Sequence, residues 1–445
     1  MVRVISQETF DAVVTENMEE FGMDRIEAVQ EAQQQFQTQG VNLDNIVTDS
    51  AEIDHPMVQA IKFLATPGDA SPEDLGQRCD IIAQECAKGL AERVMATKHK
   101  AYEILVQTTH HDEIVVQSHA MQALKELLNG NPDPLEPEGF KALLKALNET
   151  DANLIQQSLG VTLNCCVRHE GNRQNFIRNG LLIHLNRLYD TYPIEVVQIW
   201  QALVQDDDVR VPFGQAHEHA REIVEEHSAL TKLTQTIGQN SNPKELPLIL
   251  SCLSSLCVRN EYCQAVAADG GLKVLLELLV DPDQTKDVVG EVLKLIKALA
   301  GNDNVKRDIL KLDGIRVIVN SMSKYTSVKL VAMFGSSALT AVSLRSPENA
   351  TAIMACGGGQ LLTQILKIHM NTPKILISCC NAIRNIVSRS RELTAEFVEL
   401  DIEDLLNKIR RLHPSAEDAV KAALRDLGLK VDLKEIWTGG AVKNE

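Results

Sequence analysis

Asn260-Glu-Tyr-Cys, followed by Asp269-Gly-Gly-Leu-Lys-Val-Leu-Leu, is the stretch that decides the fold, because versions of it recur along the chain. Later copies begin at Asn302 and at Glu348 and run into similar apolar segments. One anchor position recurs at intervals of 43, 44 and 43 residues, as Gly271, Gly314, Gly358 and Asp401. A repeat of this length with helical apolar spacing is typical of an α-solenoid, in which each unit buries its apolar faces against its neighbours.

Weaker copies extend the repeat towards the amino terminus, with anchor positions at Ser228, Gly180, Gly139 and Ala101. We therefore expect seven or eight units over residues 57–428, each a short helix followed by two longer antiparallel helices. The anchor precedes the second helix, where glycine, or aspartate at position 401, tolerates the left-handed backbone of a sharp corner. The Asn-containing pairs 260–261, 302–303 and 348–349 recur at helix starts, and we interpret them as helix caps.

The two ends of the chain differ from the repeats. Residues 1–50 hold ten acidic and two basic side chains, a net charge of −8, and are predicted to form a helical hairpin. Its one modest apolar stripe is too small for a core, so we expect the hairpin to dock on the array or on a partner. As an acidic segment it could lie in a basic groove of the array as an intramolecular plug. Residues 51–56 are predicted to be a linker, and residues 429–445 a tail that caps the last repeat.

Composition narrows the class of function. The net charge of −17 argues against non-specific binding to nucleic acid or to an anionic membrane. No window approaches the roughly 18 apolar residues of a membrane span, and the first residues carry no secretory leader. Ten cysteines, most of them within apolar helical stretches, indicate buried thiols in a reducing compartment. We expect a cytoplasmic protein, with the nucleus as a second location.

The third helix of each unit carries a further pattern. Ala382-Ile-Arg-Asn385-Ile-Val resembles the Ala-Leu-x-Asn-Leu core of armadillo repeats. Segments outside the generic repeat, such as Gln7-Glu-Thr-Phe-Asp11, the stretch 206–219 and Ile436-Trp-Thr-Gly439, are similar to the armadillo repeat-containing protein 6 family. The resemblance implies an all-α, armadillo-type solenoid wound as a right-handed superhelix. It also implies a scaffold or adaptor that binds protein partners, and it supplies no settled biochemical activity.

In armadillo arrays the third helices line a concave groove, where importin-type members hold an extended peptide through a ladder of asparagines flanked by tryptophans. Here only two of six ladder slots hold asparagine, Asn164 and Asn385, with Ser255 in a third, and the chain has two tryptophans. A nuclear-transport cargo adaptor is therefore the alternative and not the expectation. Four positions after a ladder slot, on the same face of the helix, the groove candidates are the cations Arg168, Arg259, Arg345 and Arg389. Further groove candidates close by in the same helices are Lys294, Lys297 and Arg384.

These cations have two interpretations. The planar guanidinium of arginine suits bidentate capture of carboxylate or phosphate, which predicts an acidic or phosphorylated partner segment in the groove. Alternatively, each arginine lies in the last turn of its helix, where it caps carbonyl groups and complements the helix dipole. The sequence leaves both interpretations open.

An insertion at residues 206–219 interrupts the repeat and supplies the remaining candidates: Asp206, Asp207, Asp208, Phe213, His217 and His219. Such donors can bind a divalent metal, although their spacing matches no defined metal motif. The loop could instead contact a partner, or pack on the array through Val211-Pro-Phe213-Gly with its histidines near the surface. A metal-dependent regulator or enzyme is the alternative from another class. The chain shows no catalytic motif, so we expect no enzyme, no catalytic residue, no metal and no cofactor.

Overall fold

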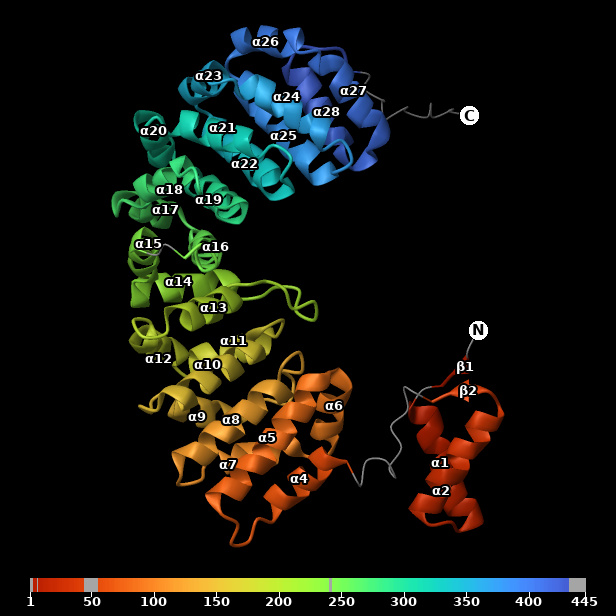
Figure 1. Ribbon diagram of the computed structural model, residues 1–445. Coiled ribbons are helices and arrows are strands. Elements are labelled where there is room, and N and C mark those ends of the chain that lie inside the picture. Colours follow the sequence, from red (N-terminus) through yellow and green to blue (C-terminus); the bar gives the residue numbers. More distant parts are fainter. Residues whose placement is uncertain (1–2, 6, 44–54, 240–241, 432–445) are drawn as a thin grey trace, which may run out of the picture. The chain divides into compact units, whose positions relative to one another are not determined.

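Within the residues that the structure describes, the protein is built from helices, apart from one pair of two-residue strands near the amino terminus (Figure 1). The computed structural model describes residues 3–5, 7–43, 55–239 and 242–431. The predicted all-α solenoid is therefore confirmed. The chain forms two compact units, residues 1–191 with 206–214 and residues 192–205 with 215–445, and each is described by itself.

The structure describes the predicted linker and the predicted capping tail only in part. Residues 51–54 of the predicted linker, and 432–445 of the predicted capping tail, lie outside the described residues. The array itself begins at Pro56, the first residue of a helix whose start is capped by the imidazole of His55.

Residues 3–5 and 7–43 form a helical hairpin with two short strands. Its elements are β1 (Arg3–Val4), α1 (Gln7–Phe21), α2 (Arg25–Thr38) and β2 (Val41–Asn42). The strands pair in parallel. The start of α2 is capped by Asp24, whose carboxylate accepts the backbone N–H of Glu27 at 2.9 Å.

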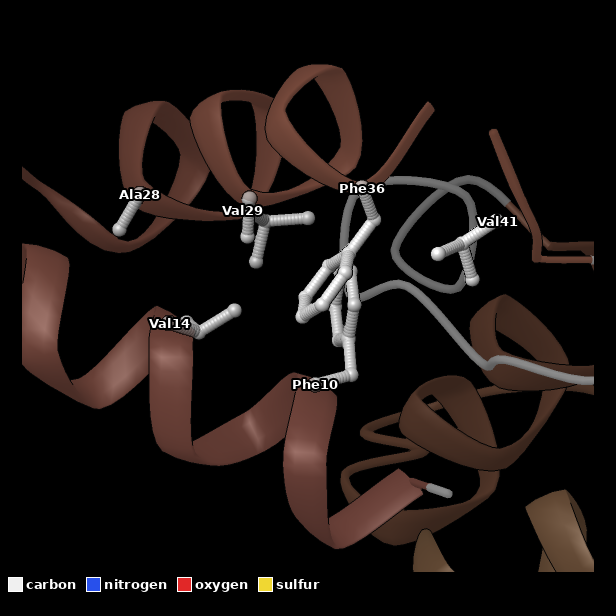
Figure 2. Packing of buried hydrophobic residues seen from close by; sticks show 7 residues of the cluster. Phe10, Val14, Ala28, Val29, Phe36 and Val41 are labelled. Atoms are coloured by element: carbon white, nitrogen blue, oxygen red, sulfur yellow. The ribbon is translucent and has the colours of Figure 1, made fainter. Parts of the chain in front are cut away.

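The hairpin has a hydrophobic core of its own. Side chains of α1 face those of α2, and Figure 2 shows Phe10 and Phe36 directed towards one another. Their ring centroids are 6.0 Å apart. The buried cluster consists of Phe10, Val14, Ala28, Val29, Ala32, Phe36 and Val41. The prediction that the hairpin is too poor in apolar residues for a core is wrong, because it left out the apolar face of α1.

The repeats of the first unit run from α4 to α12. Their bounds are α4 (Pro56–Ala65), α5 (Pro72–Lys88), α6 (Leu90–Lys98), α7 (Ala101–Thr108), α8 (Ile114–Leu127), α9 (Pro137–Ala146), α10 (Ala152–Cys166), α11 (Glu170–Arg178) and α12 (Leu181–Leu188). The third helices α5, α8 and α10 pack in succession. Between α8 and α9 a loop, residues 128–136, stands where other repeats have their short first helix.

The second unit continues the same pattern. Its helices are α13 (Pro193–Leu203), α14 (Ala216–His227), α15 (Ala229–Gln239), α16 (Leu246–Leu256), α17 (Asn260–Ala268), α18 (Gly271–Val280), α19 (Lys286–Leu299), α20 (Asp303–Lys311), α21 (Gly314–Lys324), α22 (Lys329–Ser343), α23 (Pro347–Ala355), α24 (Gly358–Ile368), α25 (Pro373–Val387), α26 (Thr394–Glu399), α27 (Ile402–Leu412) and α28 (Glu417–Asp426). Two short 3-10 turns, η1 (Arg391–Leu393) and η2 (Pro414–Ala416), precede α26 and α28.

In this unit the two longer helices of each repeat form two layers (Figure 1). The third helices α13, α16, α19, α22, α25 and α28 contact one another in succession, and we call them the third-helix layer. The second helices α15, α18, α21, α24 and α27 form the other layer in the same way. The buried side chains between the layers are mostly leucine, isoleucine, valine and alanine, as expected for repeats that share one apolar core.

The corner before each second helix lies one residue earlier than the sequence spacing predicts for three repeats. Left-handed backbone occurs at Gly270, Asp313, Gly357 and Asp401, with φ of 85°, 57°, 82° and 57°. Among the predicted anchors, Asp401 has this conformation, as do Gly180 and Ser228 in earlier repeats, with φ of 83° and 53°. Gly271, Gly314 and Gly358 begin their helices instead, and glycine is needed there for close packing. A Cβ on Gly358 would lie 2.7 Å from the carbonyl oxygen of Ile353.

Candidate functional site: the third-helix layer and the repeat junctions

The two ladder asparagines join neighbouring repeats. The Nδ2 of Asn164, in α10, donates to the carbonyl oxygen of Lys125 in α8 at 2.8 Å. Likewise Asn385, in α25, donates to the carbonyl oxygen of Thr340 in α22 at 2.9 Å. Each amide therefore stabilises the packing of successive third helices. An asparagine has a second N–H and an acceptor oxygen, so this role does not exhaust its hydrogen-bonding capacity.

Ser255 and Lys294 also bond within the third-helix layer. The hydroxyl of Ser255 donates to the carbonyl oxygen of Ser251 at 3.1 Å. The ammonium of Lys294 donates to the Ser251 hydroxyl at 2.8 Å and lies 3.0 Å from the carboxylate of Glu291. The charge of Lys294 is thus largely compensated, whereas Lys297 on the same helix is exposed.

Four of the groove candidates are arginines that lie beyond the ends of the third helices. The third helices end at Cys166, Leu256, Ser343 and Val387, two or three residues before Arg168, Arg259, Arg345 and Arg389. Arg168 and Arg345 have left-handed backbone, with φ of 53° and 58°. The helical register used to align these residues therefore does not hold, and none of them is in the last helical turn.

The cations differ in how far their charge is compensated. One guanidinium nitrogen of Arg259 lies 3.4 Å from the carboxylate of Glu225. Arg384 lies 3.1 Å from the carboxylate of Asp426, whose pKa it helps to lower together with Arg425. The side chains of Lys297, Arg345 and Arg389 are exposed.

The insertion loop, residues 206–214, packs within the first unit through its carboxylates. Asp208 is buried, and its Oδ2 accepts the backbone N–H of Glu170, the first residue of α11, at 2.9 Å. Asp207 binds the guanidinium of Arg173, which is fully buried. Phe213 exposes 88% of its surface, so the alternative in which the loop packs on the array does not hold through Phe213, although the loop does pack through these carboxylates.

Arg210 completes this ionic network. Its guanidinium lies 2.9 Å from Asp208 and 2.7 Å from Asp133, which stands in the loop between α8 and α9. The hydrogen bond from Arg210, followed by that from the N–H of Glu170, holds the pKa of Asp208 well below its usual value. Arg210 also lowers the pKa of Asp133. The loop is therefore held mainly by charge-assisted hydrogen bonds, with Asp206 exposed at its start.

The histidines of the insertion have different surroundings. His217 is exposed, whereas His219 is buried with its Nδ1 2.9 Å from the carbonyl oxygen of Leu203. The expectation that both lie near the surface is wrong for His219. Across residues 3–5, 7–43, 55–239 and 242–431, no three histidine, cysteine, aspartate or glutamate side chains are arranged to hold a metal ion.

Two buried asparagines at the repeat junctions were not among the sequence candidates. The Nδ2 of Asn349, in α23, donates to the carbonyl oxygens of Lys306 at 3.2 Å and Val342 at 3.0 Å. Asn172, in α11, bonds in the same way to Pro132 at 3.1 Å and Cys165 at 3.0 Å. Asn349 is therefore a junction residue and not the helix cap that its sequence position suggested.

Of the other two predicted caps, one is confirmed and the other is wrong. Asn302 caps α20, because its side chain accepts the backbone N–H of Asn304 at 2.8 Å. Asn260 is the first residue of α17, and the capping position is taken by Arg259.

Two histidines that were not among the sequence candidates are spaced at the repeat period. His369 and His413 follow second helices in adjacent repeats, 44 positions apart. Their Nε2 atoms lie 2.8 Å and 2.6 Å from the carbonyl oxygens of Thr326 and Met370, each in the preceding repeat. A search for polar residues at the repeat period would have identified them as junction residues.

The cysteines behave as buried apolar residues, as the sequence predicts. All ten are free, and eight of them are buried. Burial raises the pKa of Cys79, Cys86, Cys166 and Cys379 to about 12. Such thiols are protonated at neutral pH and are poor nucleophiles.

Stacked three-helix units with left-handed corners and side chain-to-backbone junctions define an armadillo-type helical repeat protein. An engineered protein of known structure superposes with a TM-score of 0.60 over 84% of this chain and 99% of its own, at 16% sequence identity. No helix in the described part of the chain is long and apolar enough to cross a membrane.

Comparison of sequences identifies the family. The ARMC6 family model matches residues 69–445, and the model of the armadillo repeat-containing protein 6 N-terminal domain matches residues 2–62. The human armadillo repeat-containing protein 6 is 34% identical over 466 residues, covering 98% of this chain and 93% of its own. The homolog from Drosophila melanogaster is 33% identical over 100% of this chain and 99% of its own. The chain belongs to the armadillo repeat-containing protein 6 family. Its fold is that of an interaction scaffold, a class that is typically without catalytic activity.

Proposed function

We propose that the protein is a non-catalytic cytoplasmic scaffold that binds an extended acidic or phosphorylated segment of a partner protein along the third-helix layer. The observation that supports this most is the exposure of Lys297 on α19, and of Arg345 and Arg389 two residues beyond α22 and α25, in an acidic chain. Arginine at such a surface can bind two oxygens of a carboxylate or phosphate at once. The buried, protonated thiols favour a reducing compartment such as the cytoplasm.

Binding of peptides to the full chain tests this proposal. We expect extended peptides rich in aspartate, glutamate or phosphoserine to bind, and lysine- and arginine-rich peptides of equal length to bind more weakly. Replacing Lys297 and Arg389 by glutamate should weaken the binding of acidic peptides. The matched control replaces Lys367 and Lys408 by glutamate, because both are exposed on second helices and the change in net charge is the same.

Two results would reject the proposal. Preferential binding of basic peptides would favour the nuclear-transport cargo adaptor instead. An equal loss of affinity in the control would show that net charge alone governs binding, with no role for the third-helix layer.

Residues 1–50 add a regulatory element to the proposal. Their net charge of −8 makes them a competitor for the same cations. Because the hairpin buries a cluster of its own, its removal does not require the repeats to lose their shared core. Deleting residues 1–54 should raise the affinity for acidic peptides, and unchanged affinity would exclude this competition.

A further inference from the structure

A cavity of about 500 Å³ lies between α20 and the start of α23. Six charged side chains line it: Asp303, Lys306, Arg307, Lys311, Arg345 and Glu348. Four are cationic and two are anionic, and one of the cations, Lys311, lies 2.9 Å from the carboxylate of Asp308. Without that paired lysine the lining carries a net charge of +1, in a chain whose net charge is −17. The cavity is therefore a local concentration of positive charge in an acidic protein.

One of the two acidic groups is already paired. The ammonium of Lys306 lies 2.7 Å from Asp303 and donates to the carbonyl oxygen of Leu344 at 2.8 Å. The hydrogen bond from Lys306, with smaller contributions from Arg345 and Arg307, holds the pKa of Asp303 below its usual value. Because Lys306 satisfies Asp303 at close range, the two arginines can direct their charge to a ligand.

The start of α11 is the corresponding junction in the first unit. Arg168 and Arg345 immediately precede the capping residues of α11 and α23, and both have left-handed backbone. Asn172 and Asn349, the third residues of these helices, make the same pair of hydrogen bonds. The two junctions therefore share backbone geometry and anchoring.

They differ in what occupies the space at the helix start. At α11 the chain places two carboxylates of its own there, Asp208 on the N–H of Glu170 and Asp207 on Arg173. At α23 the same region borders the cavity. The groups that bind these carboxylates at α11, the N–H of Glu170 and the guanidinium of Arg173, are replaced at α23 by Pro347 and Ala350.

The chemistry at α23 is not a copy of that at α11. Pro347 stands at the first helical position and has no N–H, so the first-turn donors are the N–H groups of Glu348 and Asn349. The positive charge comes from Arg345 and Arg307 on the walls of the cavity. Two guanidinium groups suit a phosphoryl group better than a single carboxylate, because phosphate offers three acceptor oxygens and a charge of about −1.5 to −2 at pH 7.

We propose that this cavity binds the phosphoryl group of a phosphorylated serine or threonine, with Arg345 and Arg307 as its principal ligands. The source of that group is the partner segment of the proposed function, on which this inference rests.

A phosphopeptide titration with the full chain tests the inference. The probe is a peptide with one phosphoserine and otherwise uncharged residues, compared with its unphosphorylated form, free O-phosphoserine and inorganic phosphate. We expect the unphosphorylated peptide to bind at least about tenfold more weakly, the effect of losing one charge-assisted hydrogen bond. Free O-phosphoserine and inorganic phosphate should also bind more weakly, because they lack the contacts of the peptide backbone.

Two substitutions separate the cavity from general charge effects. Arg345→Gly removes the guanidinium at a position whose backbone suits glycine, so the fold is retained, and we expect at least about tenfold weaker phosphopeptide binding. Arg307→Ala should weaken it in the same direction. The matched control is Lys100→Gly, because Lys100 is also an exposed cation with left-handed backbone, at φ 61°, and it should leave the affinity unchanged.

Each contrary outcome has a distinct meaning. If Arg345→Gly and the unmodified chain bound the phosphopeptide with equal affinity, the cavity would not be the phosphoryl site. The proposed function would still stand if replacing Lys297 and Arg389 by glutamate weakened the binding of acidic peptides. If peptide binding requires Arg345 but is unchanged when Lys297 and Arg389 are replaced by glutamate, the cavity is supported as the binding site and binding along the third-helix layer is rejected. If inorganic phosphate bound as tightly as the phosphopeptide, the phosphoryl group in the cavity would not come from a partner segment.

Discussion

The starts of α11 and α23 are built on the same frame and used differently. At α11, Arg173 is buried and the insertion loop brings Asp207 and Asp208 onto the helix start. At α23, alanine stands in place of that arginine, at position 350, and charged side chains border a cavity. The comparison teaches that a junction can keep its anchoring asparagine while its electrostatic role changes from internal support to an exposed binding surface.

We call the start of α11 the closed junction, because the loop carboxylates occupy it, and the start of α23 the open junction, because it borders the cavity. The largest expected effect tests the closed junction. Arg173→Ala should destabilise the protein by about 3–5 kcal/mol, because its guanidinium lies 3.6 Å from the buried carboxylate of Glu170 and binds that of Asp207, and both would lose their buried cation. Chemical denaturation followed by circular dichroism measures this. Arg307→Ala, an exposed arginine beside the open junction, is the control and should change stability by about 0.5 kcal/mol or less. Equal effects of the two substitutions would remove the distinction between the junctions.

The insertion loop gives the next largest effect. Asp208→Ala should destabilise by about 2–3 kcal/mol at neutral pH, because hydrogen bonds to a charged group are lost. The folded-state pKa of Asp208 is depressed, so its stabilisation is complete above about pH 5 and is lost as the pH falls below about 4. Denaturation midpoints of the two proteins should therefore converge at acidic pH. A difference that stays constant between pH 7 and pH 3 would contradict the role assigned to this carboxylate.

The shared anchoring predicts a matched pair of intermediate effects. Asn172→Ala and Asn349→Ala should each destabilise by about 1–2 kcal/mol, because each removes two hydrogen bonds to backbone carbonyls in a buried site. The same denaturation measurement applies to both. A much smaller effect at Asn349 would mean that the open junction is not anchored as the closed one is.

The smallest expected effect concerns backbone strain, and unlike the preceding substitutions it does not lower the stability. Arg168→Gly and Arg345→Gly should each leave stability unchanged or raise it by about 0.5 kcal/mol, because relief of left-handed strain slightly exceeds the entropy that glycine loses on folding. Thermal melting of both variants would check this. A loss of stability confined to Arg168→Gly would show that its side chain supports the closed junction.

Much of the architecture could be predicted from the sequence because it repeats. The spacing of Gly271, Gly314 and Gly358 gave the unit, the all-α class and the corners to within one residue. The offset arose because two kinds of glycine stand side by side, one for left-handed backbone at position 270 and one for close packing at position 271. Spacing alone does not separate these two requirements.

The candidate site was less predictable. Asp207 and Asp208 resemble a solvated acidic run, and their partners Arg173 and Glu170 lie more than 30 positions earlier with no local signal that links them. Helical spacing was used to align Arg168, Arg259, Arg345 and Arg389, and it fails because the third helices end before them. A pattern that depends on a helix continuing cannot reveal where it stops.

The junction bonds have a consequence for how such an array changes over evolutionary time. Asn349 and His413 both bond to main-chain oxygens of the preceding repeat, those of Lys306 and Met370. A main-chain oxygen is the same atom whatever residue carries it, so substitution of the acceptor's side chain leaves the joint intact. Neighbouring copies are therefore free to drift apart in composition, and a whole unit can be duplicated or deleted while the surviving joints keep their chemistry.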